Sequence, residues 1–220
     1  MIYSPSIACA DQLNLEKEIS EMLEMGIEMF HFDIMDGHYV PNICLSVDTV
    51  KQVNEKFKQL KIDIHLLVTN PEEYIERFKD AGADSLAFHI SSTNFAYRTV
   101  QKIKNAGMKA GVAINPSEPI ILIDSILKYL DFVLIMSIEP GFAGTKYIDE
   151  SYEKIKELIS LRKEKNLKFK IMVDGGITPE VGKRLKQLEV DILVLGYLAI
   201  FKQPDGIKGS FSRFMKYIDD

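Results

Sequence analysis

Short apolar runs alternate with longer amphipathic segments from one end of the chain to the other. The apolar runs are rich in β-branched residues, which is typical of strands buried on both faces. Eight runs are predicted to form strands, at residues 2–7, 29–34, 62–68, 85–89, 109–114, 132–136, 168–173 and 192–195. Because a longer segment with helical period follows each run, the pattern predicts successive βα units and a parallel sheet.

The segments between the strands repeat apolar residues at helical spacing. Helices are predicted at residues 13–25, 47–57, 71–79, 97–106, 152–163, 179–188 and 207–218. Three proline pairs mark expected helix starts, because a capping side chain followed by proline suits the first turn. These pairs are Asn70-Pro71, Asn115-Pro116 and Thr178-Pro179.

The fold class predicted from these elements is α/β, a single (β/α)8 TIM barrel over residues 1–220. No proline-rich linker or change of composition divides the chain into two domains. An open doubly wound sheet usually has fewer strands and a glycine-rich first turn, whereas residues 4–9 contain no glycine. In such a barrel the chemistry lies where the strands end and the βα loops begin.

Ionisable residues gather at three of these strand ends. The second predicted strand carries His31 and Asp33, which its period of two places on one face. The third carries His65, and the seventh leads directly into Asp174. Imidazole nitrogen and carboxylate oxygen are ligands that zinc, iron(II), manganese and cobalt accept. These four residues therefore predict a site for one divalent metal ion; the alternative for His31 is a hydrogen-bonded core histidine.

Four neighbouring ionisable residues have weaker claims to the metal. Asp36 and Asp63 follow or face the same strand ends, and we interpret them as supporting or structural groups. His38 and His89 have weaker claims than His31 and His65, and we interpret both as structural histidines.

Glycines follow the last three predicted strands. Gly141 and Gly144 come after the sixth strand, Gly175 and Gly176 after the seventh, and Gly196 after the eighth. Glycine lets backbone N–H groups approach an anion closely, and the loops after strands seven and eight often bind phosphate in this fold. Each cluster alone is compatible with a simple turn, but three in neighbouring loops predict a phosphate pocket.

The charge of the chain gives little reason to expect a nucleic-acid partner. The 27 basic residues are scattered among 32 acidic ones, for a net charge of -5, and form no basic stripe. A phosphate pocket remains compatible with this balance, because net charge describes the far field and local amide groups act at the pocket.

The sequence also predicts a soluble, cytoplasmic protein without membrane association. No segment reaches roughly 18 consecutive apolar residues, and the first residues lack the basic flank and apolar stretch of a secretory signal. Cys9 and Cys44 are too few and too far apart for a disulfide framework or a Cys-x-x-Cys zinc site. We interpret both as ordinary thiols, with Cys9 as a candidate for lining a pocket.

Several segments together are similar to the ribulose-phosphate 3-epimerase family, and the resemblance spans nearly the whole chain. The matching segments are Ser4-Pro5-Ser6-Ile7 with Asp11, His31-Phe32-Asp33-Ile34-Met35-Asp36-Gly37-His38-Tyr39-Val40-Pro41-Asn42, Asp63-Ile64-His65-Leu66, Met136-Ser137-Ile138-Glu139-Pro140-Gly141-Phe142 and Val173-Asp174-Gly175-Gly176.

The resemblance implies a metal-dependent isomerase of carbohydrate metabolism, a ketose-phosphate 3-epimerase of the pentose phosphate pathway that forms a homo-oligomer. His31, Asp33, His65 and Asp174 would hold one divalent metal ion, and Asp33 and Asp174 would also be the catalytic acid/base pair. Contacts with the phosphorylated ketose would come from Ser6, Met35, Met136, Gly141, Phe142, Ala143, Gly144, Gly175, Gly176, Gly196 and Tyr197.

Inversion of a carbon next to a ketone requires two bases, because the proton leaves one face and returns to the other. The second and seventh strands of the barrel are separated by the first and eighth, so Asp33 and Asp174 are expected to approach the substrate from opposing sides. The metal would stabilise the cis-enediolate that forms between the two proton transfers.

The sequence leaves two substrate pairs open, ribulose 5-phosphate with xylulose 5-phosphate and allulose 6-phosphate with fructose 6-phosphate. Thr145 and Tyr197 depart from the common pentulose-phosphate pattern. Cys9, the pair Leu45-Ser46, and Ala143 within Phe-Ala-Gly look like the allulose-6-phosphate 3-epimerase branch.

Two other functions are compatible with a barrel that binds sugar phosphates. A sugar-phosphate lyase or decarboxylase barrel would carry an Asp-x-Lys-x-x-Asp motif, whereas the second strand here reads His31-Phe32-Asp33 without a lysine. A non-catalytic sugar-phosphate-binding protein would be expected to have lost part of the ligand set, and all four ligands are present. Fold alone would not separate these readings.

Overall fold

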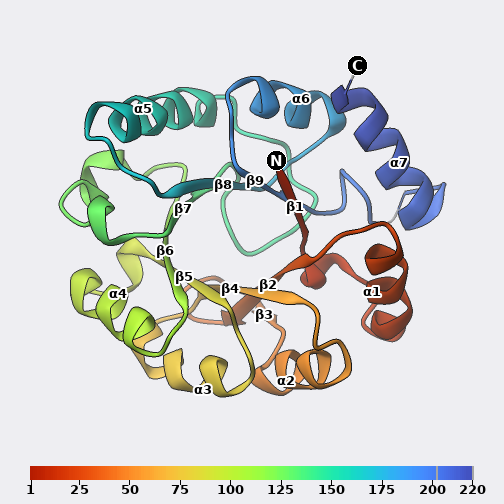
Figure 1. The fold of residues 1–220 in the computed structure, drawn as a ribbon, viewed down its shortest axis with the longest axis horizontal. Coiled ribbons are helices and arrows are strands. Elements are labelled where there is room, and N and C mark those ends of the chain that lie inside the picture. The colour runs from red at the N-terminus through yellow and green to blue at the C-terminus, as the bar shows by residue number, and fades with distance from the viewer. Residues whose placement is uncertain (202, 220) are drawn as a thin grey trace.

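A closed ring of eight parallel strands forms the centre of the protein, and helices surround it (Figure 1). The computed structural model describes residues 1–201 and 203–219. The eight barrel strands are β1 (Ile2–Pro5), β2 (Met29–Asp36), β4 (Lys61–Leu67), β5 (Ser85–His89), β6 (Lys109–Ile114), β7 (Phe132–Met136), β8 (Lys170–Asp174) and β9 (Ile192–Leu195). Each barrel strand pairs in parallel with the next, β9 pairs with β1, and a bridge between Ser6 and His31 closes the ring. The predicted (β/α)8 barrel is confirmed.

A further strand that the hydrophobic pattern did not predict, β3 (Ile43–Cys44), lies in the loop after β2. It pairs antiparallel with the end of β2, Met35 with Cys44 and Asp36 with Ile43. A run of two residues is too short to show the alternation of apolar and polar residues that predicts a strand. The pairing folds this loop back over the carboxyl end of the barrel.

The outer layer contains seven α-helices among the described residues: α1 (Leu15–Glu24), α2 (Val47–Lys56), α3 (Ile75–Asp80), α4 (Ala96–Asn105), α5 (Ser151–Glu164), α6 (Pro179–Gln187) and α7 (Gly206–Asp219). Short 3-10 helices lie at η1 (Ile7–Cys9), η2 (Pro71–Glu73), η3 (Ile90–Ser92), η4 (Ile120–Ile123) and η5 (Leu127–Tyr129). Within residues 1–201 and 203–219, no helix has the length and apolar character needed to span a bilayer.

The three expected helix starts have different outcomes. Thr178 caps α6, because its side chain accepts a hydrogen bond from the backbone N–H of Val181. Asn70 makes no such bond; it takes a left-handed conformation, and Pro71 begins a 3-10 helix instead. No α-helix follows Asn115-Pro116, and the prediction of one there is wrong.

Lys154 of α5 explains the structure after Asn115. Its Nζ donates to the backbone carbonyls of Asn115, Pro116 and Glu118 at 2.6–2.8 Å. Three carbonyl groups that point toward one ammonium group are arranged as in a turn, not along a helix axis. The chain between β6 and β7 therefore continues through η4 and η5 rather than through a regular α-helix.

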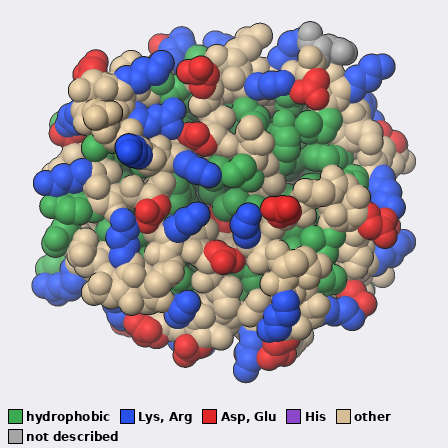
Figure 2. Space-filling view, viewed as in Figure 1, with side chains coloured by type: hydrophobic (Ala, Val, Ile, Leu, Met, Phe, Trp, Pro, Cys, Tyr) green, Lys and Arg blue, Asp and Glu red, His purple; other side chains and the backbone are tan. Residues whose placement is uncertain are grey.

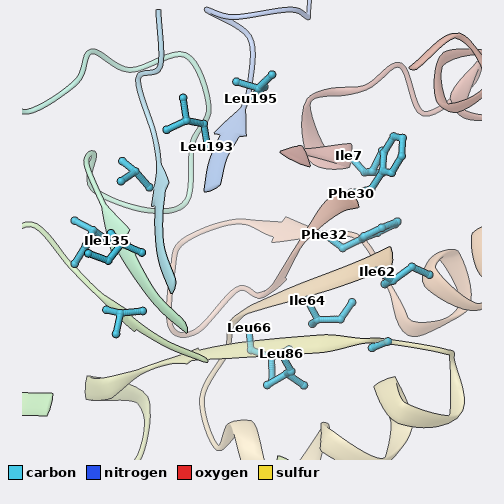
Figure 3. Packing of buried hydrophobic residues seen from close by; sticks show 14 of the residues in the cluster. Ile7, Phe30, Phe32, Ile62, Ile64, Leu66, Leu86, Ile135, Leu193 and Leu195 are labelled. Atoms are coloured by element: carbon cyan, nitrogen blue, oxygen red, sulfur yellow. The ribbon is translucent and has the colours of Figure 1, made fainter. Parts of the chain in front are cut away.

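The alternation of side chains along the strands creates two distinct layers. Outward side chains such as Phe30, Phe32 and Ile64 are fully buried beneath the helices (Figure 3). Inward side chains of β5 to β9 form a smaller apolar cluster that includes Ala87, Leu134 and Met172. The other half of the interior, along β1, β2, β4 and β5, is rich in buried polar side chains: Ser4, Ser6 just after β1, His31, Asp33, Asp63, His65, Ser85 and His89.

A barrel interior that is half polar is costly unless its groups are paired, so this half is where function is expected. The surface differs from this interior. On the face shown in Figure 2, basic, acidic and hydrophobic side chains are mixed, and no histidine is visible. Charges of both signs on that face produce no single-sign field.

Candidate active site

Four buried or nearly buried side chains converge at the carboxyl end of the barrel. His31 Nε2 lies 3.4 Å from His65 Nδ1, and Asp33 Oδ1 lies 3.3 Å and 3.0 Å from these two nitrogens. Asp174 Oδ2 lies 3.8 Å and 3.9 Å from the same nitrogens. All four donor atoms are within 4.8 Å of one another. The structure thus brings together the four residues that the sequence predicted as metal ligands.

Strand register explains this convergence. Asp33 of β2 is paired with His65 of β4, and His31 is paired with Asp63. Since inward positions recur every second residue, these four side chains form two neighbouring rows inside the barrel. Asp174 completes the group from β8 across the ring.

The donor set fits a divalent metal ion on its chemistry. Two imidazole nitrogens and two carboxylate oxygens suit zinc, iron(II), manganese or cobalt, whose bonds to these atoms of about 2.0–2.2 Å match donor spacings of this order. Two carboxyl groups buried side by side also favour a cation, because without one they would repel strongly if both were ionised.

Asp63 has the supporting position that the sequence suggested. Its Oδ2 lies 2.7 Å from His31 Nδ1, and its Oδ1 accepts a hydrogen bond from Ser85. A carboxylate accepting from Nδ1 keeps a proton on that nitrogen and leaves Nε2 as the ring nitrogen that faces the cluster and can bind a metal once it is deprotonated. Asp63 thereby orients His31 without joining the metal group.

Asp36 holds the loop after β2. Its carboxylate accepts from the backbone N–H groups of His38, Tyr39 and Thr69, and from the Thr69 hydroxyl. Burial alone would raise the pKa of Asp36, but these donors outweigh it and lower the pKa to about 2. The group is structural, and exposed His38 is hydrogen-bonded to Asp36 well outside the metal cluster.

The two carboxylates of the cluster have opposite proton affinities in the metal-free protein. Burial would raise the pKa of Asp33, but the neighbouring imidazoles of His31 and His65 outweigh it and hold the pKa well below its ordinary value. Burial, followed by the charge of Asp33, raises the pKa of Asp174 to about 7. Near neutral pH, Asp33 is ionised and Asp174 is the group that carries a proton.

The imidazoles differ in the same way. Burial lowers the pKa of His31, yet the charges and hydrogen bonds of Asp33 and Asp63 outweigh burial and raise the pKa well above its ordinary value. Burial lowers the pKa of His65 despite Asp33. His65 is therefore the imidazole that is more readily neutral.

Metal binding should consequently depend on pH. A metal must displace the proton that the raised pKa of His31 keeps on its Nε2, so we expect the apparent metal affinity to rise about tenfold per pH unit below that pKa for this proton alone. Competition with a chromogenic chelator between pH 5.5 and 8 measures this slope. Asp63→Asn removes one of the charges that raise the pKa of His31 and should flatten the slope toward pH 8; an identical slope would contradict the assignment.

A cavity of about 320 Å³ opens beside the cluster. Asp33 and Asp174 line it together with every residue for which substrate contact was predicted: Ser6, Met35, Met136, Gly141, Phe142, Ala143, Gly144, Gly175, Gly176, Gly196 and Tyr197. His31 and His65 are fully buried and lie behind the carboxylates. The predicted residues therefore share one pocket, while their individual roles stay predictions.

The pocket also includes residues to which the sequence analysis gave no role. Asn42 donates from Nδ2 to the Gly141 carbonyl at 2.8 Å, which ties the loop after β2 to the loop after β7. Ser137, just outside the pocket, donates from its hydroxyl to the carbonyls of Asp174 and Gly175. Both belong to segments quoted for the family resemblance, but only the fold shows what they contact.

The two cysteines lie close to this pocket as thiols. Cys9 and Cys44 both line the pocket, and both are free cysteines. Burial raises the pKa of Cys9 to about 12 and that of Cys44 to about 11. The thiols remain protonated and unreactive near neutral pH, as expected of ordinary buried cysteines.

Gly176 allows two loops to meet at the pocket. Its φ is +65°, and a Cβ built on it would lie 2.3 Å from the backbone nitrogen of Tyr147. We expect Gly176→Ala to push the loop before Tyr147 out of place and to lower kcat/KM at least about tenfold, while the metal content stays unchanged.

Gly206→Ala is the matched control for this variant. Gly206 has a φ of +66° but nothing within 4 Å of its Cβ position, so it has the same backbone penalty without the clash. Its kcat/KM should remain close to that of the unaltered protein. Equal kcat/KM values for both variants would show that the loop contact is unimportant.

Comparisons with known proteins identify the family of this sequence. The model of the Ribulose-phosphate 3 epimerase family matches residues 2–201. Curated proteins named ribulose-phosphate 3-epimerase include one from Bacillus subtilis, 39% identical over 206 residues, with 92% of this chain and 93% of the relative covered. Another, from Escherichia coli, is 34% identical over 204 residues, with 93% and 90% covered.

Solved structures with low sequence identity share the barrel. The 3-keto-L-gulonate-6-phosphate decarboxylase of Vibrio cholerae has a TM-score of 0.72 at 10% identity, with 100% of this chain and 97% of that chain covered. The 3-hexulose-6-phosphate synthase of Salmonella typhimurium has a TM-score of 0.67 at 16% identity, with 99% and 100% covered. At such identities the likeness concerns the fold alone.

Proposed function

Because the chain belongs to the ribulose-phosphate 3-epimerase family, we propose that it inverts C3 of a phosphorylated ketose by transferring protons through Asp33 and Asp174. One observation carries this proposal: the two carboxylates enter a single pocket from β2 and β8, which are separated in the ring by β1 and β9. A planar intermediate held between them is open to one carboxyl group on each face.

Each aspartate directs one carboxylate oxygen toward the histidines. Its second oxygen is left to transfer a proton. Asp33 Oδ1 faces His65, while its Oδ2 accepts a 2.5 Å hydrogen bond from Ser6, a residue that lines the pocket. Asp174 turns Oδ2 toward the imidazoles. This arrangement supports a carboxylate that holds a metal with one oxygen and moves a proton with the other.

The proton affinities support the direction of transfer. Ionised Asp33 accepts the C3 proton from one face and leaves a cis-enediolate, and protonated Asp174 returns a proton to the opposite face. The two groups exchange roles in the reverse reaction. A divalent cation, when held by His31, Asp33, His65 and Asp174, supplies positive charge for the developing charge on the substrate oxygens.

The glycine-rich loops are suited to the phosphate end of the substrate. Gly141 and Gly144 have φ values of +115° and +90°, and Gly175 one of +113°, conformations that expose the backbone without a Cβ in the way. These loops line the pocket together with Gly196. Phosphate bound there anchors the sugar and orients C3 between the aspartates.

Ribulose 5-phosphate is the substrate we propose first, since the relatives named above are called ribulose-phosphate 3-epimerases. Allulose 6-phosphate is the second candidate. Cys9 and Ala143, which look like the allulose-6-phosphate 3-epimerase branch, both line the pocket. Measurement of kcat/KM for both ketoses on the metal-loaded protein tests the proposal. Turnover of neither compound, with no exchange of the C3 proton into solvent, would overturn it.

The decarboxylase and synthase alternatives lack a structural basis in the pocket. Those activities were expected to need a lysine at the end of the second strand, and β2 contains His31, Asp33 and Met35 at its inward or pocket positions. No lysine is among the pocket-lining residues of the described chain. The homo-oligomeric state implied by the family resemblance and the cytoplasmic location predicted from the sequence remain proposals.

A further inference from the structure

His89 is the one buried histidine to which neither the metal nor the proton transfers give a task. It ends β5 with no exposed surface, and its Nε2 lies 2.8 Å from Nε2 of His65. The ring centroids are 5.0 Å apart and the planes differ by 28°. This separation is what two rings require when they meet end to end through these nitrogens, as in a well-aligned N–H···N hydrogen bond.

The identity of the donor in this bond decides whether His65 can bind a metal. A neutral imidazole has one N–H donor and one lone-pair acceptor. His65 Nδ1 faces the cluster, 3.0 Å from Asp33 and 3.4 Å from His31, so its lone pair is available to a metal only if the proton is on Nε2. That Nε2–H must then donate to His89, whose own proton is on Nδ1.

The other half of His89 argues against a purely structural role. Its Nδ1 is buried without a hydrogen-bond partner among the described atoms. An unpartnered polar nitrogen is unfavourable in a core, and an apolar ring would avoid it. The feature that only histidine supplies here is the acceptor on Nε2.

Tyr39 holds His89 in this orientation. The rings of Tyr39 and His89 lie 4.8 Å apart, and the Tyr39 hydroxyl accepts from Nδ2 of Asn115 and bonds to Ser91. The ring of His89 thus packs on a tyrosine ring that is itself held by side chains of two other loops.

We propose that His89 is a positioning residue that fixes His65 in the tautomer whose Nδ1 binds the metal. This inference depends on the proposed function only in that His65 must be a metal ligand. It gives His65 the counterpart of what Asp63 does for His31, with an imidazole in place of a carboxylate. Outer partners of this kind typically change metal affinity 10–100-fold when removed.

Two variants separate the acceptor from the shape of the residue. His89→Phe keeps a ring beside Tyr39 but removes the acceptor, and His89→Gln offers a side-chain oxygen that can accept from His65. We expect the Kd for Zn²⁺ and Co²⁺, measured by chelator competition, to rise about 10–100-fold in His89→Phe and to stay close to the unaltered protein in His89→Gln. The thermal midpoint of metal-free His89→Phe should change little, because the variant removes one unpartnered polar atom, His89 Nδ1, and leaves another, His65 Nε2.

A nuclear magnetic resonance measurement tests the tautomer directly. In the zinc-loaded protein labelled with ¹⁵N, we expect a scalar coupling between the two Nε2 atoms and chemical shifts that place the proton on His65 Nε2. A metal affinity of His89→Phe equal to that of the unaltered protein, or an equal loss in both variants, would overturn the inference and leave the proposed function standing. Failure of the unaltered protein to bind zinc or cobalt at all would overturn both.

Discussion

Asp174→Asn is expected to lower kcat/KM for C3 epimerisation by about 10²–10⁴-fold, the contribution usual for a positioned acid or base. The amide cannot donate or accept the C3 proton, although it keeps an oxygen that can face His31 and His65. Steady-state turnover in both directions, with metal content measured on the same samples, checks this result.

Proton exchange gives the sharper form of this test. With Asp33 intact, the variant should still exchange the C3 proton of the epimer that presents this proton to Asp33, and should not exchange that of the other epimer. Turnover near that of the unaltered protein, or equal exchange of both epimers, would show that Asp33 and Asp174 do not divide the two faces between them.

The fold should survive this substitution. Burial and the charge of Asp33 already raise the pKa of Asp174 to about 7, so the ionised form is disfavoured in the metal-free protein. Loss of that charge is expected to leave the thermal midpoint of metal-free Asp174→Asn unchanged or higher. Asp131→Asn, at the amino end of β7 where Asp131 accepts from the backbone of Ala110, is the control and should keep normal turnover.

The barrel and its metal cluster were predictable because both depend on local periodicity. Inward positions on a parallel strand recur every second residue, so His31 and Asp33 had to share a face, and the βα order placed all strand ends together. The observed register pairs Asp33 with His65, an inward position with an inward position, as this periodicity requires; the choice of these two residues came only with the fold. The substrate roles still depend on the family resemblance.

Other features depend on contacts that sequence patterns do not encode. The Asn115-Pro116 pair resembles a helix start. However, Lys154, 39 residues later along the chain, donates a hydrogen bond to the carbonyl of Asn115. The contact of Asn42 with Gly141 joins residues 99 positions apart. From the sequence, His89 is interpreted as a structural histidine. Only the fold shows that its Nε2 faces Nε2 of His65.

Removal of the metal is expected to abolish epimerisation and to lower the thermal midpoint substantially. Two buried carboxylates and two imidazoles whose donor atoms lie within 4.8 Å of one another should bind a divalent cation far more tightly in the folded than in the unfolded chain. A free metal concentration 1,000 times its Kd stabilises the fold by about 4 kcal/mol, or roughly 8–16 °C for a chain of this size. Calorimetry of chelated and reloaded protein measures the shift, and restored turnover checks the activity.

Two histidine variants accompany the metal-removal experiment, one inside the cluster and one outside it as the matched control. His65→Ala removes one donor and should lose most of the metal-dependent rise in thermal midpoint, whereas His38→Ala, an exposed side chain outside the cluster, should keep it. Reloading with zinc, iron(II), manganese or cobalt should restore turnover to His38→Ala because the four donors are intact. Chelated protein that keeps both its turnover and its thermal midpoint would show that the acidic pair works without a cation, and the two-carboxylate mechanism would then need another source of positive charge.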